Sequence, residues 1–226
     1  MKKVAILLLA SCLGNTTLAG GKADPMLGSV IINELERRSD QRESAVDMEA
    51  WLGHDIDKLW VKLERSAEAG STDEAALQLL YSRAIAPFWD LQTGLRRHID
   101  DGDADNTLVL GVQGLAPFNV ETDAALFVDD DGMVTAEIEL GYELRFTQQW
   151  ILEPEIILIA HSETDRERSL GSGLAEVETT LRLFYYPQRE WAPYVGLAWH
   201  RTLGDQRDFA ETAQSEQWLI GIRGWF

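Results

Sequence analysis

The 226-residue chain has little of what anchors most catalytic sites: one cysteine, four histidines and four methionines. It has no His-Glu-x-x-His or Cys-x-x-Cys motif and no glycine-rich phosphate loop, so zinc-hydrolase, thiol and phosphate chemistry lack their usual residues. Gly171-Ser172-Gly173 lacks the Gly-x-Ser-x-Gly spacing of a hydrolase nucleophile. We therefore expect the protein not to be an enzyme. A Ser-His-Asp triad assembled in space is the one catalytic alternative left open.

Basic residues and long apolar runs are also scarce. The chain has 38 acidic and 20 basic residues, for a formal net charge of −18, which argues against nucleic acid as a partner. After residue 19 no stretch approaches the about 18 to 20 consecutive apolar residues that a membrane helix needs. Two options remain: a soluble exported protein, or a closed barrel that satisfies its backbone groups between strands.

The first residues predict export. Lys2-Lys3 precede an apolar stretch from Val4 to Ala10, and Thr17-Leu18-Ala19 offers a cleavage site, so residues 1–19 are predicted to be a signal peptide. Cleavage there would remove the only cysteine and with it any disulfide. A second possibility is Leu9-Ala10-Ser11-Cys12, a lipoprotein-like box that leaves lipidation at Cys12 open.

Residues 57–226 contain ten strand-like runs, whereas residues 20–56 do not. The segment from Arg37 to Glu49 is charged and buries too little to order itself, so 20–56 is predicted to be a short, partly flexible periplasmic arm. Each later run has about the 9 to 11 residues that a tilted strand needs to cross a bilayer. The runs cover roughly 58–67, 75–85, 88–98, 107–116, 119–128, 134–145, 149–160, 174–185, 192–202 and 216–226.

The connections and the aromatic residues favour a membrane barrel over a soluble β-sandwich. Short connections alternate with longer polar ones, as periplasmic turns alternate with external loops. Aromatic residues gather beside the short connections, as in an interfacial girdle. We predict an all-β fold, a ten-stranded antiparallel transmembrane β-barrel in the bacterial outer membrane, with both termini periplasmic. The girdle residues are Phe88, Trp89, Phe118, Phe146, Trp150, Tyr185, Tyr186, Trp191, Tyr194, Trp225 and Phe226.

Nine blocks, in order from residue 24 to the last, resemble the copper resistance protein B family. They are Asp24-Pro25-Met26-Leu27, Trp51-Leu52-Gly53-His54-Asp55, Lys58-Leu59-Trp60-Val61-Lys62, Leu79-Leu80-Tyr81-Ser82-Arg83, Pro87-Phe88-Trp89-Asp90-Leu91-Gln92, Gly111-Val112-Gln113-Gly114-Leu115-Ala116-Pro117, Gly171-Ser172-Gly173-Leu174, Ala192-Pro193-Tyr194-Val195-Gly196, and the Gly-x-Arg-x-Trp-Phe ending. The resemblance implies an outer-membrane protein that helps bacteria survive excess copper, usually beside a periplasmic multicopper oxidase.

The chain departs from this family at its N-terminal side. Many members carry an arm rich in Met and His before the Asp-Pro block, suited to copper through thioether and imidazole ligands. Here that stretch is only Gly20 to Ala23. Any metal role must therefore rest on the barrel.

Alternation along the strands predicts which side chains face the lumen. In the run 134–145, Glu137 and Glu139 face inward, and in 149–160 Glu153 and Glu155 do. The whole predicted interior has eleven carboxylates against five Lys or Arg. Its other members are Glu143, Arg145, Glu176, Glu178, Arg182, Lys62, Glu64, Asp90, Gln92, Arg96, His98, Gln113, Glu121, Asp123, His200 and Arg223.

Two interpretations of this interior stay open. Glu–Arg ladders fill narrow barrels, which would make the charges structural. Carboxylate rings also favour divalent cations, which would make the lumen a copper path. On the second interpretation the metal-ligand candidates are Glu137, Glu139, Glu153, Glu155, His98 and His200. The predicted function is copper binding or passage through the barrel; the alternative is a filled barrel that docks a periplasmic multicopper oxidase through the arm.

Overall fold

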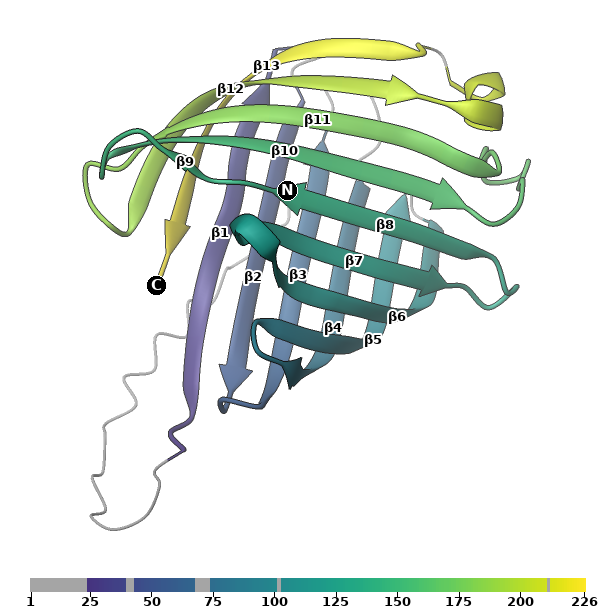
Figure 1. Ribbon diagram of the computed structural model, residues 1–226. Coiled ribbons are helices and arrows are strands. Elements are labelled where there is room, and N and C mark those ends of the chain that lie inside the picture. Colours follow the sequence, from purple (N-terminus) through teal and green to yellow (C-terminus); the bar gives the residue numbers. More distant parts are fainter. Residues whose placement is uncertain (1–23, 40–42, 68–73, 101–102, 211) are drawn as a thin grey trace, which may run out of the picture.

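The computed structural model describes residues 24–39, 43–67, 74–100, 103–210 and 212–226. The predicted signal peptide and Cys12 lie outside the described residues. Within the described part, a single antiparallel sheet closes into a barrel (Figure 1), because the first strand pairs with the last. The strands are β1 (Leu27–Arg38), β2 (Ser44–Gly53), β3 (Asp57–Ala67), β4 (Glu74–Ala86), β5 (Trp89–Asp100), β6 (Asp103–Ala116), β7 (Val120–Val128), β8 (Val134–Gly141), β9 (Leu144–Arg145), β10 (Trp150–His161), β11 (Gly173–Tyr185), β12 (Trp191–Thr202) and β13 (Gln214–Trp225).

The two-residue strand β9 continues the course of β8 along β10. The ladder breaks between Gly141 and Leu144, where the Tyr142 N–H donates to the Pro154 carbonyl at 3.1 Å. Pro154 has no N–H to donate in return, so the pairing is interrupted there. Counting β8 and β9 as one, twelve strands surround the barrel.

The prediction of ten strands and a separate arm is wrong. Residues assigned to the arm form β1 and β2, which pair with each other, with β13 and with β3, and so close the barrel. The described barrel therefore begins at Leu27 rather than at Asp57. The ten predicted runs are confirmed, since each corresponds to a strand from β3 to β13.

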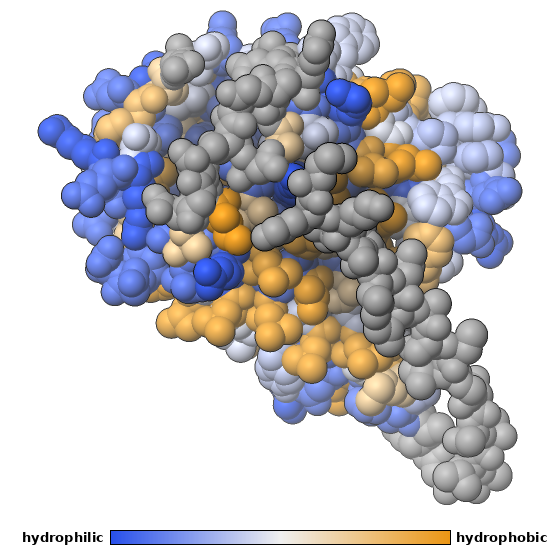
Figure 2. Space-filling view, turned by 180° about the vertical axis from the view of Figure 1, so that it is seen from behind, coloured by the Kyte–Doolittle hydropathy of each residue, from blue (hydrophilic) through white to orange (hydrophobic). Residues whose placement is uncertain are grey.

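The strands alternate apolar side chains outward with polar ones inward. In β4, Leu77 and Leu79 are exposed, whereas Gln78 and Ser82 are buried. Figure 2 shows apolar side chains over the middle of one face and hydrophilic ones toward its edges. This pattern is the reverse of a soluble protein and suits a barrel surrounded by lipid. Among the described residues no helix is long and apolar enough to cross a membrane.

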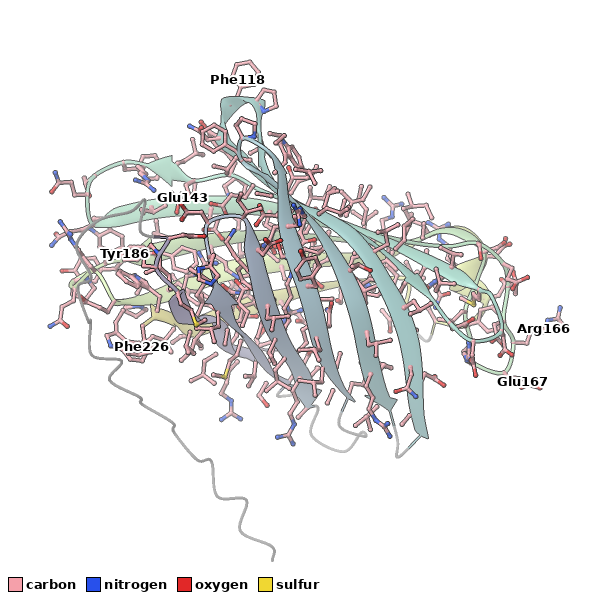
Figure 3. The ribbon with its side chains drawn as sticks, turned by 90° about the horizontal axis from the view of Figure 1, so that it is seen from below. Phe118, Glu143, Arg166, Glu167, Tyr186 and Phe226 are labelled. Atoms are coloured by element: carbon pink, nitrogen blue, oxygen red, sulfur yellow. The ribbon has the colours of Figure 1, made fainter. Side chains whose placement is uncertain are left out.

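The two ends of the barrel differ. Both described chain ends lie at the end with short turns, where the Val30 N–H donates to the Phe226 carbonyl at 2.9 Å. Figure 3 shows Tyr186 and Phe226 at this end and Arg166 and Glu167 at the other, in the loop between β10 and β11. The longest connections, after β10 and after β12, lie at that other end.

The predicted aromatic girdle is confirmed in part. Phe118, at the turn after β6, is 88% exposed and projects from the barrel (Figure 3), and Phe88 and Phe226 are exposed as well. Tyr194, however, is 3% exposed and points into the barrel, and Tyr186 lines its interior. The girdle prediction rested on closeness to the short turns alone. It did not take into account that the side chains at these two positions face inward.

Candidate functional site

A cavity of about 580 Å³ lies inside the barrel. Its lining comes from β1–β8, β10 and β13, from Glu143 between β8 and β9, and from Tyr186 just after β11. Among the described residues, its only basic side chains are Lys62 and Arg223. The carboxylates that line it are Glu34, Asp47, Glu49, Glu64, Glu121, Asp123, Glu137, Glu139, Glu143, Glu153 and Glu155.

Four of the six predicted metal-ligand candidates line this cavity. Glu137 and Glu139 reach it from β8, and Glu153 and Glu155 reach it from β10. The two pairs lie on neighbouring strands, because β8 pairs with β10 and Glu139 is in register with Ile157 of β10. Strand alternation alone was sufficient to place these four side chains.

The two histidine candidates lie elsewhere. His200, on β12, has Nε2 3.2 Å from Glu176 Oε2 and does not line the cavity. His98, on β5, does not line it either, and its buried Nδ1 has no hydrogen-bond partner in the described part of the chain. In that same part, no group of three or more His, Cys, Asp or Glu is arranged to hold a metal ion. The six candidates therefore do not form one preformed site.

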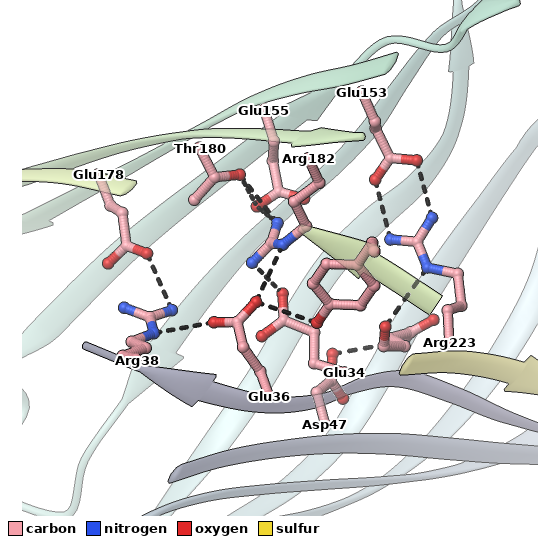
Figure 4. Close-up of polar contacts among 12 residues, drawn as sticks. Glu34, Glu36, Arg38, Asp47, Glu153, Glu155, Glu178, Thr180, Arg182 and Arg223 are labelled. Atoms are coloured by element: carbon pink, nitrogen blue, oxygen red, sulfur yellow. Dashed lines mark hydrogen bonds and ion pairs between the residues drawn. The ribbon is translucent and has the colours of Figure 1, made fainter. Parts of the chain in front are cut away.

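One side of the interior is filled by an ion-pair network around Arg182 (Figure 4). The guanidinium group of Arg182 is 2% exposed and pairs with Glu34, with Glu36 at 3.3 Å and with Glu155 at 3.0 Å. The Tyr194 hydroxyl donates to Glu36 at 2.9 Å. Because Arg182 comes from β11 and Glu34 from β1, with β12 and β13 between them in the sheet, the network crosses the interior.

Two further pairs extend this network along the same wall. Arg38, on β1, lies 3.1 Å from Glu178 on β11. Arg223, on β13, donates two hydrogen bonds to Glu153 on β10, at 2.7 and 2.8 Å. Such a bidentate pair is geometrically specific as well as strong. On this wall the structural interpretation of the lumen charges holds.

Other carboxylates, on β2, β7 and β8, stand outside this network in the cavity. Asp47, Glu49, Glu121, Glu137 and Glu139 all line it, and no described Lys, Arg or His lies within ion-pair distance of their carboxylates. Asp47 accepts a hydrogen bond from the Asn33 amide at 3.3 Å. The cavity thus keeps carboxyl groups without an ion-pair partner among the described residues.

Strand alternation missed part of this site and misplaced one residue. Glu34, Asp47 and Glu49 belong to β1 and β2, which were taken for a flexible arm. The alternation of Val46, Asp47, Met48 and Glu49 was the signal that could have found two of them. Arg145, predicted to face the lumen, has a side chain that is 69% exposed.

At the long-loop end, Arg168 ties the β10–β11 loop to the rest of the barrel. Its guanidinium group lies 2.5 Å from Asp129 and 3.7 Å from Asp165. The hydrogen bond to Asp129 raises the pKa of Arg168 above its usual value, so it stays charged. On the other side of the loop, Gln206 accepts a hydrogen bond from the Gly171 N–H. This loop therefore bridges two neighbouring connections.

Comparisons with known proteins agree with the barrel and identify its family. Two solved porin structures share the fold, "KdgM porin in complex with disordered oligogalacturonate" and the NanC porin. Each has a TM-score of 0.56 over 88% of this chain and 99% of the porin, at 10% and 11% identity. At such low identity the likeness concerns the fold alone.

Two curated relatives are much closer in sequence. Copper resistance protein B of Escherichia coli is 34% identical over 203 residues, which cover 87% of this chain and 69% of that protein. The copper resistance protein B homolog of Pseudomonas syringae pv. tomato is 34% identical over 197 residues, 85% of this chain and 67% of the homolog. The family model described as copper resistance protein B precursor (CopB) matches residues 26–226. The chain therefore belongs to the copper resistance protein B family.

Proposed function

We propose that this chain is an outer-membrane protein of copper resistance whose acidic cavity binds copper ions and lets them pass through the barrel. Family membership and the names of both relatives support the copper resistance role. The lipid-facing exterior and the porin-like fold support the outer membrane. Copper is the cargo on this proposal, and no catalysed reaction is part of it.

The observation that carries the proposal is the set of cavity carboxyl groups without a basic partner. A filled barrel has its charges matched, and rings of carboxylates without counter-ions favour cations. Five carboxylates at the cavity have no described basic partner, including Glu137 and Glu139. Oxygen ligands from such groups suit a mobile Cu²⁺ ion rather than a tightly held Cu⁺ ion, which prefers sulfur.

The structure weakens the alternative, docking of a multicopper oxidase through an N-terminal arm. Residues 27–53 form β1 and β2, and the described part of the chain ahead of them is only 24–26. Deleting residues 24–56 would open the barrel as well as remove a dock. That deletion therefore cannot separate the two functions, and substitutions inside the cavity are needed instead.

The test is the double variant Glu137→Gln with Glu139→Gln, which replaces two cavity carboxyl groups by amides and keeps the side-chain shape. We expect copper tolerance to fall most of the way to that of a strain without the gene. Copper content per cell under copper challenge should shift in the same direction as in that strain, and its sign gives the direction of movement. The matched control is Glu163→Gln with Glu167→Gln, two exposed carboxylates of the β10–β11 loop, which should leave both readouts unchanged.

Heat-dependent gel mobility would confirm that both double variants fold. Full tolerance and unchanged copper content in a folded Glu137→Gln, Glu139→Gln protein would contradict the cavity as the path.

A further inference from the structure

One ion pair crosses the cavity on the side away from the Arg182 network. Lys62 Nζ, from β3, lies 2.7 Å from Asp123 Oδ2, on β7. The sheet places β4, β5 and β6 between these two strands, so the Lys62 side chain spans the interior rather than lying along one wall. Both side chains line the cavity and are only 15% and 26% exposed.

Further carboxylates stand next to both ends of this pair. Glu49 is the register partner of Lys62 on the neighbouring strand β2, and Glu139 is the register partner of Asp123 on β8. Both Glu49 and Glu139 line the cavity. The Lys62 ammonium group is thus a fixed cation among carboxylates from both sides of the lumen.

Lys62 differs from Arg223, the other basic residue of the lining. Arg223 is bound by both oxygens of Glu153 and also donates to the Asn33 carbonyl at 3.3 Å, so its position is fixed several times over. Within the described ranges, the one side-chain hydrogen bond of Lys62 goes to Asp123. A lysine ammonium is also a point charge on a flexible stem, which can swing aside more readily than a planar guanidinium.

We propose that Lys62 is the gate of the lumen: its ammonium group closes the cavity by pairing with Asp123, and an entering divalent cation displaces it. This inference rests on the proposed function, because it names the residue that controls the passage of copper. The displaced ammonium and the divalent ion compete for the same carboxylates. The gate also repels cations while it is closed, so its removal should speed their passage.

A purely structural role makes a different prediction. If the pair only stabilised the barrel, removing either partner would change the rate of Cu²⁺ passage in the same direction. If Lys62 is a charged gate, removing Lys62 and removing Asp123 should change the rate of Cu²⁺ passage in opposite directions. Lys62→Met removes the positive charge, whereas Asp123→Asn leaves that charge unpaired in the path.

The experiment uses the full-length protein in phosphatidylcholine vesicles that contain a Cu²⁺-quenched dye. We expect Lys62→Met to admit Cu²⁺ about thirtyfold faster than the wild type, the effect of one unit charge on a divalent ion at about 4 Å in a high dielectric. The Asp123→Asn protein should admit Cu²⁺ more slowly than the wild type. The control is Lys58→Met, on the same strand and face, which removes a similar pair, Lys58–Asp90 at 2.8 Å, that does not line the cavity. It should stay within about twofold of the wild type.

The outcomes separate this inference from the proposed function. Equal rates for Lys62→Met and Lys58→Met, or a change of the same sign in Lys62→Met and Asp123→Asn, would overturn the gate. If Glu137→Gln with Glu139→Gln still slows the entry of Cu²⁺, only the gate has failed. If no variant exceeds protein-free vesicles and that double variant keeps full copper tolerance in cells, both proposals fall.

Discussion

At the scale of single residues, Arg182 shows how much the interior depends on matched charges. Its guanidinium group is 2% exposed and contacts three carboxylates, Glu34, Glu36 and Glu155. Burying such groups costs desolvation energy that only close pairing offsets. Removing the cation therefore does more harm than the loss of one contact, because it leaves several buried carboxylates without a partner.

We expect Arg182→Met to lower the free energy of unfolding by about 3 to 5 kcal/mol, the usual cost of breaking a buried pair. Urea unfolding in lipid vesicles, followed by tryptophan fluorescence, would measure the change. Arg145→Met is the control, since its side chain is 69% exposed and pairs only with nearby Glu143; it should cost less than about 1 kcal/mol. Equal effects of the two substitutions would show that the Arg182 network contributes no special stability.

At the scale of the strands, sequence alternation predicted most of the fold but missed β1 and β2. For β1 the reason is a β-bulge: the pairing of β1 shifts register between Ile32 and Glu34 on the β2 side, and between Ile32 and Leu35 on the β13 side. A bulge places one extra residue in the strand and inverts the alternation beyond it. Val30 and Leu35, five positions apart, are therefore both exposed. No strict period of two runs through this segment, and its charged residues resemble a flexible arm.

The candidate site was predictable in composition but not in pairing. Alternation correctly placed Glu137, Glu139, Glu153 and Glu155 inside the barrel. It could not tell that Glu153 and Glu155 are bound by arginines whereas Glu137 and Glu139 have no described basic partner. Arg182 reaches Glu155 from the neighbouring strand β11, but Arg223 reaches Glu153 from β13, which does not pair with β10. Pairing across a lumen depends on the strand count, which was predicted two strands too low, and on the register, which the sequence pattern does not give.

Closure through β1 and β13 can be tested with a disulfide. Arg37 and Ile220 are register partners, so cysteines at both positions should form a disulfide on mild oxidation in a chain without Cys12. The cross-link would change the mobility of the denatured, unreduced protein on a gel. Arg37→Cys with Ile222→Cys, two residues out of register, should cross-link far less. Equal cross-linking of the two pairs would contradict the register, and none in either would contradict a strand β1 next to β13.

At the scale of the whole molecule, the cavity is not placed symmetrically between the two ends. Its lining reaches the short-turn end at Glu143 and Tyr186, and among the described residues it includes none from the loops 129–133, 162–172 and 203–213 at the other end. Outer-membrane barrels have their short turns in the periplasm. The acidic cavity should therefore be reached from the periplasm, and the loop held by Arg168 should face the outside of the cell.

This orientation predicts which inserted epitopes antibodies can reach. An epitope between Arg166 and Glu167, in the β10–β11 loop, should be labelled on intact cells, because the loop is exposed and lies at the long-loop end. An epitope between Gln188 and Arg189, in a short turn, should be labelled only after the outer membrane is permeabilised. Reversed labelling would turn the cavity toward the cell exterior. Copper would then reach its carboxylates from the medium, and a lower cellular copper content could no longer be explained by capture in the periplasm.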